Sequence, residues 1–313
     1  MSDQKIAFLF PGQGSQAVGM GRDLAEKFTV ARETFAEADA ALGYSLAKLC
    51  FEGPAEQLKQ TEFTQPAIFA VSMAAYRVLA SRGVEPQIAA GHSLGEYAAC
   101  AAAGVMSFAD AIRALRSRGQ FMQEAVPEGQ GAMAAVLGLD ADAVRGACEA
   151  AATETKEIVS PANLNAPEQI VISGGAAGVA RASELAREKG AKKVVALQVS
   201  APFHCALMQP AQERLAEVLK QIEMHDPRFR IVSNVTANVT KRGGRERDLL
   251  IEQVTSPVRW VESVRCMMDA GASTFVEVGP GKVLSGLLRQ MDRAQRCMNV
   301  EDAASLEKAL AGN

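Results

Sequence analysis

A five-residue segment, Gly91-His92-Ser93-Leu94-Gly95, joins a short apolar stretch to an alanine-rich one. Ile88–Ala90 before it is typical of a buried strand, and Glu96–Ala103 after it is typical of an interior helix. A strand, a tight turn and a helix in this order predict a nucleophile elbow with Ser93 at its tip, near amide hydrogens that stabilise an oxyanion. Glycine fits on both sides, because a side chain there would strike the neighbouring strand or helix. In the alternative interpretation, Ser93 only caps the helix.

Strands and helices alternate through the first and last parts of the chain, which predicts an α/β fold with a parallel sheet. The expected strands are Ile6–Phe10, Ile88–Ala90, Arg230–Ser233 and Thr274–Glu277. The expected helices are Met20–Phe28, Ala31–Leu42, Gln65–Arg82, Glu96–Ala103, Asp110–Ala125, Gln209–Met224 and Arg245–Glu252.

The middle of the chain has a different pattern, in the order βαββαβ, which is typical of ferredoxin-like folds. Its expected elements are Ala132–Leu137, Asp140–Ala151, Glu157–Leu164, Gln169–Ser173, Ala176–Lys189 and Lys192–Val199. We therefore expect a small subdomain over residues 128–197, inserted into a large one formed by residues 1–127 and 198–313.

The composition of the 313 residues is that of an ordinary soluble enzyme, with 48% hydrophobic residues and a formal net charge of −3. This charge balance argues against nucleic-acid binding. The six cysteines are scattered without a CxxC pair, which argues against disulfides and zinc and fits a reducing compartment. The apolar stretch Tyr97–Phe108 is too short to span a membrane. We expect a cytoplasmic location, since the N-terminal segment lacks the long apolar stretch of a signal peptide.

A serine nucleophile needs a base, and the chain has three histidines. His92 is adjacent to Ser93, so we expect it to point away and to pack or orient. His225 precedes Asp226-Pro227 in an expected surface turn. His204 follows an expected strand, and strand ends are where α/β enzymes place catalytic groups, so it is the candidate base. No acidic residue is an obvious third member, and a backbone carbonyl would orient the imidazole equally well.

The segment Gly12-Gln13-Gly14-Ser15-Gln16-Ala17, after the first expected strand, fits the dinucleotide-binding pattern G-x-G-x-x-A. A nicotinamide- or flavin-dependent oxidoreductase is therefore an alternative from another class. It leaves Ser93 and His204 unexplained, and the acidic residue expected about 20 positions later is not evident. In the elbow interpretation, the same loop supplies a second backbone amide for an oxyanion.

Arg118 interrupts an apolar helical stripe formed by Ala111, Ala114, Leu115 and Met122. A buried guanidinium is unfavourable unless it is paired, and its planar fork suits a carboxylate. Periodicity alone favours a pair with an internal Asp or Glu. The alternative is that Arg118 binds an anionic substrate.

Together these segments resemble the malonyl-CoA:acyl carrier protein transacylases, the loading enzymes of bacterial type II fatty acid synthesis. That family is related to the acyltransferase domains of polyketide and animal fatty acid synthases. The resemblance covers nearly the whole chain. It rests on several motifs in the same order, namely Phe10-Pro11-Gly12-Gln13-Gly14-Ser15-Gln16, Gly91-His92-Ser93-Leu94-Gly95-Glu96, Arg118-Gly119 with Met122-Gln123, Pro202-Phe203-His204, Asn234-Val235-Thr236, Gln253-Val254-Thr255-Ser256-Pro257-Val258-Arg259-Trp260 and Glu277-Val278-Gly279-Pro280-Gly281.

The resemblance implies an α/β-hydrolase-like core with a ferredoxin-like insertion. It also implies a ping-pong transfer of malonyl from malonyl-CoA to the phosphopantetheine thiol of acyl carrier protein. In that mechanism Ser93 is the nucleophile, His204 is the general base, and the amides of Gln13 and Leu94 form the oxyanion hole. Arg118 holds the malonyl carboxylate, which reverses the preference for an internal pair.

The resemblance further implies that the main-chain carbonyl of Gln253 orients His204, and that Asn163 and Asn165 lie near the cleft. Phe203 stands where some members have serine, and its ring is expected to disfavour a 2-methyl branch without excluding it. No metal and no cofactor are expected, and the protein is expected to be a monomer whose partners are malonyl-CoA and the carrier. A polyketide-type acyltransferase and a serine esterase remain alternatives.

Overall fold

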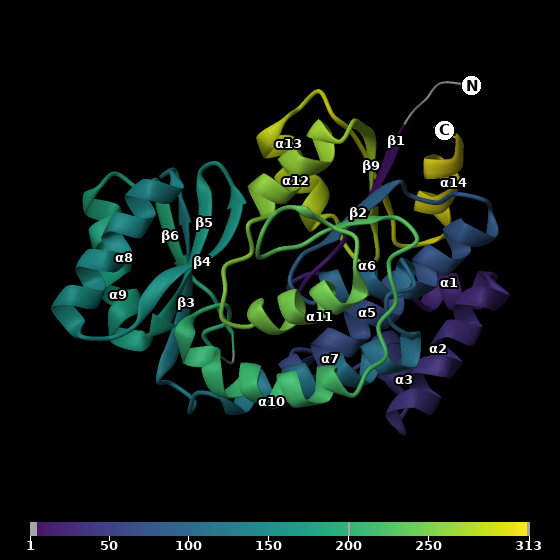
Figure 1. Cartoon of the computed structure of the whole chain (residues 1–313), viewed down its shortest axis with the longest axis horizontal. Coiled ribbons are helices and arrows are strands. Elements are labelled where there is room, and N and C mark those ends of the chain that lie inside the picture. The colour runs from purple at the N-terminus through teal and green to yellow at the C-terminus, as the bar shows by residue number, and fades with distance from the viewer. Residues whose placement is uncertain (1–4, 200, 312–313) are drawn as a thin grey trace.

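The computed structural model describes residues 5–199 and 201–311, which form a large part and a small part, each around its own sheet (Figure 1). The sheet of the large part has the strand order β10-β9-β1-β2-β7-β8. Neighbouring strands are parallel except for β7 and β8. The predicted parallel sheet is therefore found, with two further strands at its edges. Its strands are β1 (Lys5–Phe10), β2 (Ile88–Gly91), β7 (Arg230–Val232), β8 (Val239–Thr240), β9 (Ala272–Val278) and β10 (Arg296–Val300).

Helices cover both faces of this sheet, and β1 shows why its sequence is almost entirely apolar. Phe8 and Phe10 belong to one buried cluster, and Ala7 and Leu9 belong to another that includes Trp260. A strand buried on both faces has no polar side to alternate with. The helices are α1 (Arg22–Lys27), α2 (Thr29–Leu42), α3 (Leu46–Glu52), α4 (Ala55–Leu58), α5 (Thr61–Ser81), α6 (Gly95–Ala102), α7 (Phe108–Glu124), α10 (Gln209–Lys220), α11 (Gly243–Glu252), α12 (Trp260–Asp269), α13 (Val283–Met291) and α14 (Ala303–Ala311), with a 3₁₀ turn η1 at Ala206–Met208.

The small part has the predicted element order βαββαβ, and its sheet is antiparallel with the strand order β4-β5-β3-β6. Its two helices pack together with the sheet around one buried cluster (Figure 1). The last strand is shorter than predicted and ends at Ala196. Leu197 N still donates to Met133 O of β3 at 2.9 Å, and residues 197–199 line a cavity. The elements are β3 (Gly131–Leu137), α8 (Ala141–Thr155), β4 (Val159–Ala166), β5 (Gln169–Gly175), α9 (Ala176–Glu188) and β6 (Lys193–Ala196).

The two parts are joined by backbone hydrogen bonds as well as by the chain connections. Leu164 N donates to Val258 O at 2.9 Å, and Val258 N donates to Ala162 O at 2.8 Å. Strand β4 of the small part is therefore tied to the segment that follows α11 in the large part.

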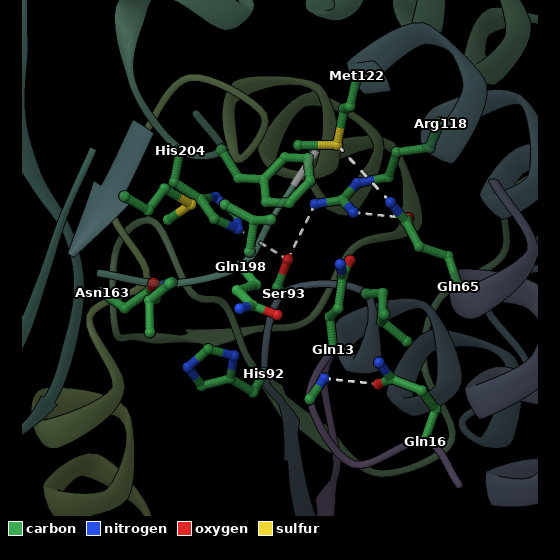
Figure 2. A pocket seen from close by; sticks show the side chains of 16 residues that line it. Gln13, Gln16, Gln65, His92, Ser93, Arg118, Met122, Asn163, Gln198 and His204 are labelled. Atoms are coloured by element: carbon green, nitrogen blue, oxygen red, sulfur yellow. Dashed lines mark hydrogen bonds between the residues drawn. The ribbon is translucent and has the colours of Figure 1, made fainter. Parts of the chain in front are cut away.

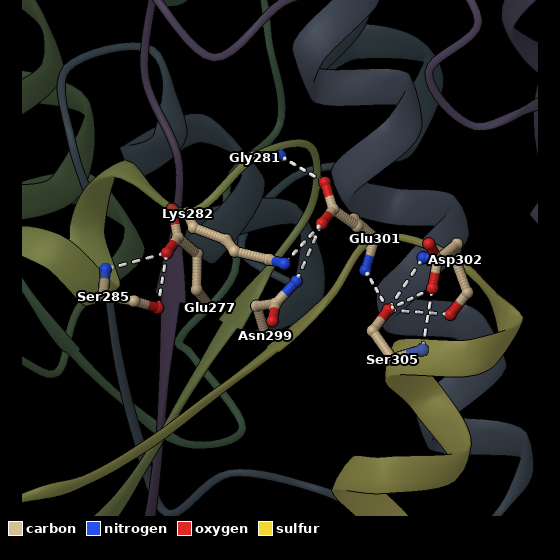
Figure 3. A network of polar contacts seen from close by, with 8 residues as sticks. All are labelled: Glu277, Gly281, Lys282, Ser285, Asn299, Glu301, Asp302 and Ser305. Atoms are coloured by element: carbon tan, nitrogen blue, oxygen red, sulfur yellow. Dashed lines mark hydrogen bonds and ion pairs between the residues drawn. The ribbon is translucent and has the colours of Figure 1, made fainter.

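A polar network fixes the loop after β9, shown in Figure 3. Buried Glu277 accepts hydrogen bonds from the backbone N–H groups of Leu284 and Ser285 at the start of α13. Glu301 accepts from Gly281 N at 2.9 Å and pairs with Lys282. A Cβ at Gly279 would lie 2.9 Å from the Pro11 side chain, so this loop packs closely on the segment that follows β1.

No helix within residues 5–199 and 201–311 is long and apolar enough to cross a membrane.

Candidate active site

The turn between β2 and α6 is the predicted strand–turn–helix, with Ser93 at its tip. Ser93 has a φ of 52°, a left-handed conformation that is unfavourable for a residue with a Cβ. A Cβ at Gly91 would overlap the carbonyl group of Gly95, and a Cβ at Gly95 would overlap the carbonyl oxygen of Phe10. Both glycines are therefore required by close backbone approach, as the sequence predicts.

His204 lies against Ser93, with 2.8 Å between Nε2 and the Ser93 Oγ (Figure 2). Its Nδ1 lies 2.9 Å from the main-chain oxygen of Gln253 and 3.2 Å from that of Ser256. Two carbonyl acceptors place the ring proton on Nδ1, which leaves the Nε2 lone pair facing the serine hydroxyl. Burial, and then the charge of Arg118, lowers the pKa of His204 to about 3, so the imidazole is neutral.

Arg118 is 1% exposed on α7, and its guanidinium is bound by neutral groups. Nη1 donates to Gln65 Oε1 at 2.7 Å, while Nη2 donates to Gln253 Oε1 at 2.9 Å and to Ser93 Oγ at 3.1 Å. Among the described residues no carboxylate lies at ion-pair distance from it, although Glu96 acts on it electrostatically, and its Nε has no hydrogen-bond partner. The internal Asp or Glu partner that periodicity favours is wrong, because amide oxygens take that place.

Ser93, His204 and Arg118 line one cavity of about 330 Å³ between the two parts of the molecule. Figure 2 shows the Ser93 hydroxyl between the imidazole of His204 and the guanidinium of Arg118. Phe203 and Asn163 also line it, and both are mostly buried. The cavity therefore brings a serine hydroxyl, a neutral imidazole and a guanidinium that has no ion-pair partner among the described residues to one place.

Gln13 and Leu94 line the same cavity on the side of the elbow. No described acceptor takes the backbone N–H of either residue. Leu94 is the N-cap of α6, where backbone N–H groups have no partner within the helix. Both N–H groups are thus free to bind a ligand oxygen.

The other two histidines lie away from the serine hydroxyl. His92 is half-buried, with Nε2 2.8 Å from Asn165 Oδ1 and its ring packed on Trp260. Burial lowers the pKa of His92, which fits a neutral packing residue. His225 is exposed, as predicted for a surface turn.

The glycine-rich segment after β1 does not open a helix, since α1 begins only at Arg22. A Cβ at Gly12 would lie 2.6 Å from the carbonyl oxygen of His92, so this loop packs on the elbow. A dinucleotide site needs the helix N-terminus at these glycines. The oxidoreductase alternative is therefore wrong.

Sequence reasoning missed Gln65 and the side chain of Gln253, which bind Arg118 from 53 and 135 residues away. The signal for Gln65 is its place directly before Pro66-Ala67-Ile68-Phe69-Ala70-Val71, the apolar run of α5. Across residues 5–199 and 201–311, no cluster of three His, Cys, Asp or Glu side chains is suited to a metal ion.

The fold and site define an acyltransferase, and comparison with known proteins agrees. The model of the family described as "Acyl transferase domain" matches residues 7–309. A Bacillus subtilis (strain 168) protein named "Malonyl CoA-acyl carrier protein transacylase" is 49% identical over 306 residues, which are 98% of this chain and 96% of that protein. The chain therefore belongs to the malonyl-CoA:acyl carrier protein transacylase family.

Solved structures of this family share the whole fold. The "malonyl CoA-acyl carrier protein transacylase" from Coxiella burnetii has a TM-score of 0.96 at 41% identity, over 98% of this chain and 97% of that one. A malonyl-transacylase in complex with its type II PKS acyl-carrier protein has a TM-score of 0.96 at 45% identity, over 99% of this chain and 100% of that one.

Proposed function

We propose that the protein moves a malonyl group from malonyl-CoA to the phosphopantetheine thiol of acyl carrier protein, through an ester on Ser93, and so supplies extender units for fatty acid synthesis. One observation carries the proposal: the guanidinium of Arg118, without a carboxylate partner among the described residues, donates to Ser93 Oγ inside the cavity. An acyl group with a free carboxylate satisfies that cation while its thioester carbon lies at the serine. The names of the relatives agree.

In the first half-reaction, Ser93 Oγ attacks the thioester carbon of malonyl-CoA while His204 Nε2 accepts the hydroxyl proton. The carbonyl oxygen becomes an oxyanion held by the N–H groups of Gln13 and Leu94. When the C–S bond breaks, His204 returns the proton to the departing CoA thiolate. The main-chain carbonyl of Gln253 keeps the imidazole oriented throughout.

In the second half-reaction, the carrier's phosphopantetheine thiol gives its proton to His204 and its sulfur attacks the ester carbon. The bond between that carbon and Ser93 Oγ breaks, and Oγ takes the proton back. The two half-reactions exchange a thioester for a thioester, so no metal and no cofactor are part of the proposal.

Phe203 and Asn163 are the proposed substrate-binding residues beyond Arg118, because both line the cavity that holds Ser93. The Phe203 ring occupies volume that a 2-methyl branch on the acyl group needs. Asn165 has a different role, since its side chain binds His92.

The proposed partners are malonyl-CoA and an acyl carrier protein, with neither nucleic acid nor membrane, for a monomer in the cytoplasm. The solved complex of a related malonyl-transacylase with its carrier supports this choice. Carrier proteins of this kind are acidic, so exposed cations near the cavity are the docking candidates. Lys193 is exposed at the start of β6, whereas Lys192 already pairs with Glu168.

The proposed fold description is an α/β-hydrolase-like core of residues 1–127 and 198–313, with a ferredoxin-like subdomain over residues 128–197. The entry and exit of the inserted segment lie together, since a Cβ at Gly131 would overlap the ring of Pro202. The strand order β4-β5-β3-β6 supports the ferredoxin-like assignment.

Two alternatives keep the same serine chemistry. An acyltransferase of a polyketide-type pathway differs only in the carrier that it loads, and the related complex contains such a carrier. A serine esterase for neutral substrates has no use for the Arg118 cation.

The proposal is tested by loading the enzyme with malonyl-CoA, removing free CoA esters, and adding a phosphopantetheinylated carrier. Malonyl must leave the protein and appear on the carrier thiol much faster than it appears in water. Release of free malonate at the same rate with and without the carrier contradicts transfer and favours the esterase.

A further inference from the structure

The backbone of the nucleophile is held by two side chains that lie far from it in the sequence. Ser93 N donates to Asn234 Oδ1 at 2.7 Å, and Asn234 Nδ2 donates to Gly91 O at 2.7 Å. Gln253 Nε2 donates to Ser93 O at 3.0 Å. The left-handed conformation of Ser93 persists only where its surroundings hold it. The bonds to Ser93 N and Ser93 O hold both of its peptide groups, and the bond to Gly91 O fixes Asn234 against the end of β2.

Glu96, a fully buried residue in the first turn of α6, binds the Gln253 side chain and the backbone N–H of Asn234. Glu96 Oε2 accepts from Gln253 Nε2 at 2.6 Å and from Asn234 N at 3.2 Å. The Gln253 side-chain amide has one orientation, because it lies between a carboxylate and a guanidinium. Its Nε2 donates to Glu96 and its Oε1 accepts from Arg118. In that orientation Nε2 also reaches Ser93 O.

The orientation of the Ser93 carbonyl decides where the next amide points. A peptide unit is planar and trans, so Leu94 N–H is directed opposite to Ser93 C=O. Because Gln253 Nε2 binds that carbonyl, the Leu94 N–H is directed away from Gln253. Leu94 itself lines the cavity at Ser93.

We propose that Glu96 is a positioning residue for acyl transfer, which holds the Gln253 side chain so that Ser93 and the Leu94 oxyanion donor keep their reactive geometry. This inference rests on the proposed function. The backbone N–H of Glu96 also donates to Ser93 O at 3.0 Å, a bond that any residue at this position keeps. The carboxylate of Glu96 has no hydrogen bond to Ser93 and acts through Gln253.

A second buried carboxyl group, Glu246, interacts with Glu96 and offers a matched comparison. Burial raises the pKa of both carboxyl groups, and at Glu96 the hydrogen bonds from Gln253 and Asn234 oppose the rise. Glu246 Oε2 lies 4.0 Å from Cys100 Sγ and its Oε1 has no hydrogen-bond partner, and no hydrogen bond joins Glu246 to Gln253 among the described residues. Of the two carboxyl groups, Glu96 is therefore the one that binds Gln253.

The test compares Glu96→Gln with Glu246→Gln, two isosteric changes that each remove one buried carboxyl group. We expect Glu96→Gln to lower kcat for malonyl transfer on the order of tenfold or more, because losing an oxyanion donor outright lowers it about 10²–10³-fold. KM for malonyl-CoA stays within about twofold, because Gln65 still holds the Arg118 guanidinium. Glu246→Gln keeps both values. All rates are expressed per site that forms a malonyl ester, so a smaller folded fraction does not mimic the effect.

Wild-type kcat in Glu96→Gln, or an equal fall in both variants, overturns the inference. If Glu96→Gln does not fold, Gln253→Leu serves instead, because it removes Nε2 and keeps the main-chain carbonyl that orients His204. It also removes the Oε1 that binds Arg118, so KM for malonyl-CoA is measured with kcat and the effect of Nε2 is the part that appears in kcat. Its kcat must fall by at least the same factor, and an unchanged kcat overturns the inference. Failure of the wild-type enzyme to form the ester refutes the proposed function instead, so the two failures are distinguishable.

Discussion

The guanidinium Nη2 of Arg118 lies 3.1 Å from the hydroxyl oxygen of Ser93, inside a shared cavity. Neutral amide oxygens of Gln65 and Gln253 supply its other contacts, so the positive charge of a buried side chain is solvated but not cancelled. Such a cation favours an acyl group that carries its own negative charge.

Replacing Arg118 with alanine is expected to lower kcat/KM for malonyl-CoA at least about 100-fold, since each hydrogen bond to a charged group contributes about 1.5–3 kcal/mol. Acetyl-CoA is expected to be used better, because its methyl group no longer meets a buried charge. The measurement is the steady-state rate of transfer with both thioesters. The matched control is Arg113→Ala, which removes an exposed ion pair with Asp110. Unchanged malonyl kinetics in Arg118→Ala contradict the assignment.

Replacing Phe203 with serine is expected to raise the use of methylmalonyl-CoA relative to malonyl-CoA by about 10- to 100-fold. The ring lines the cavity, and one methyl group in such a site is typically discriminated by about 1–3 kcal/mol. Competition between the two thioesters, followed by mass analysis of the acylated protein, gives the ratio directly. A ratio equal to that of the wild type shows that another residue sets the preference.

The elbow could be predicted from sequence because its signals are local: a short apolar strand, two glycines and an alanine-rich helix within sixteen residues of Ile88. The order of elements in the small part could be predicted for the same reason. The partners of Arg118 could not be predicted, because Gln65 and Gln253 come from distant segments and an amide carries no charge signal. The main-chain carbonyl that orients His204 has no side-chain signature at all, and only the family resemblance indicated it.

The predicted elements differ from the structure in three places, for different physical reasons. Strand β10 lies at a sheet edge and is mostly half-buried, so it lacks the continuous apolar run of β1. Helix α13 has a helical signal in its sequence, since Leu284, Leu287 and Leu288 form one buried face, but at nine residues it is short. Helix α5 begins at Thr61, four residues before the predicted start, so that Pro66 lies in its second turn.

The neutral state of His204 makes a prediction about pH. Because burial and Arg118 lower the pKa of His204 to about 3, the imidazole remains able to accept a proton well below its usual pKa of about 6.5. We expect kcat/KM for malonyl-CoA to stay level as the pH falls from 8 to 5. A rate that falls with an apparent pKa near 6.5 shows that the base is more exposed than this geometry allows.

The lowered pKa of His204 also makes the free energy of unfolding depend on pH. Between about pH 3 and 6.5, His204 binds a proton in the unfolded chain but not in the folded protein. The contribution of His204 to the free energy of unfolding is therefore complete above about pH 6.5 and is lost as the pH falls toward 3. Unfolding in urea at several pH values measures this slope.

Glycine at position 95 is expected to be irreplaceable even by alanine. The added Cβ would overlap the Phe10 carbonyl oxygen, where backbone must move, so Gly95→Ala should lower the free energy of unfolding by more than about 4 kcal/mol or prevent folding. Gly146→Ala is the control, since no atom lies within 4 Å of its Cβ in the middle of α8, and it should stabilise by about 0.5–1 kcal/mol. Equal stability of the two variants contradicts the packing argument.

The most direct test of the central claim is the mass of the intact protein after brief exposure to malonyl-CoA, followed by peptide mapping. The account predicts one added malonyl group, located on Ser93 and lost on addition of a carrier thiol, with no addition to Ser93→Ala. A malonyl group on another residue, or persistent labelling of Ser93→Ala, would contradict it.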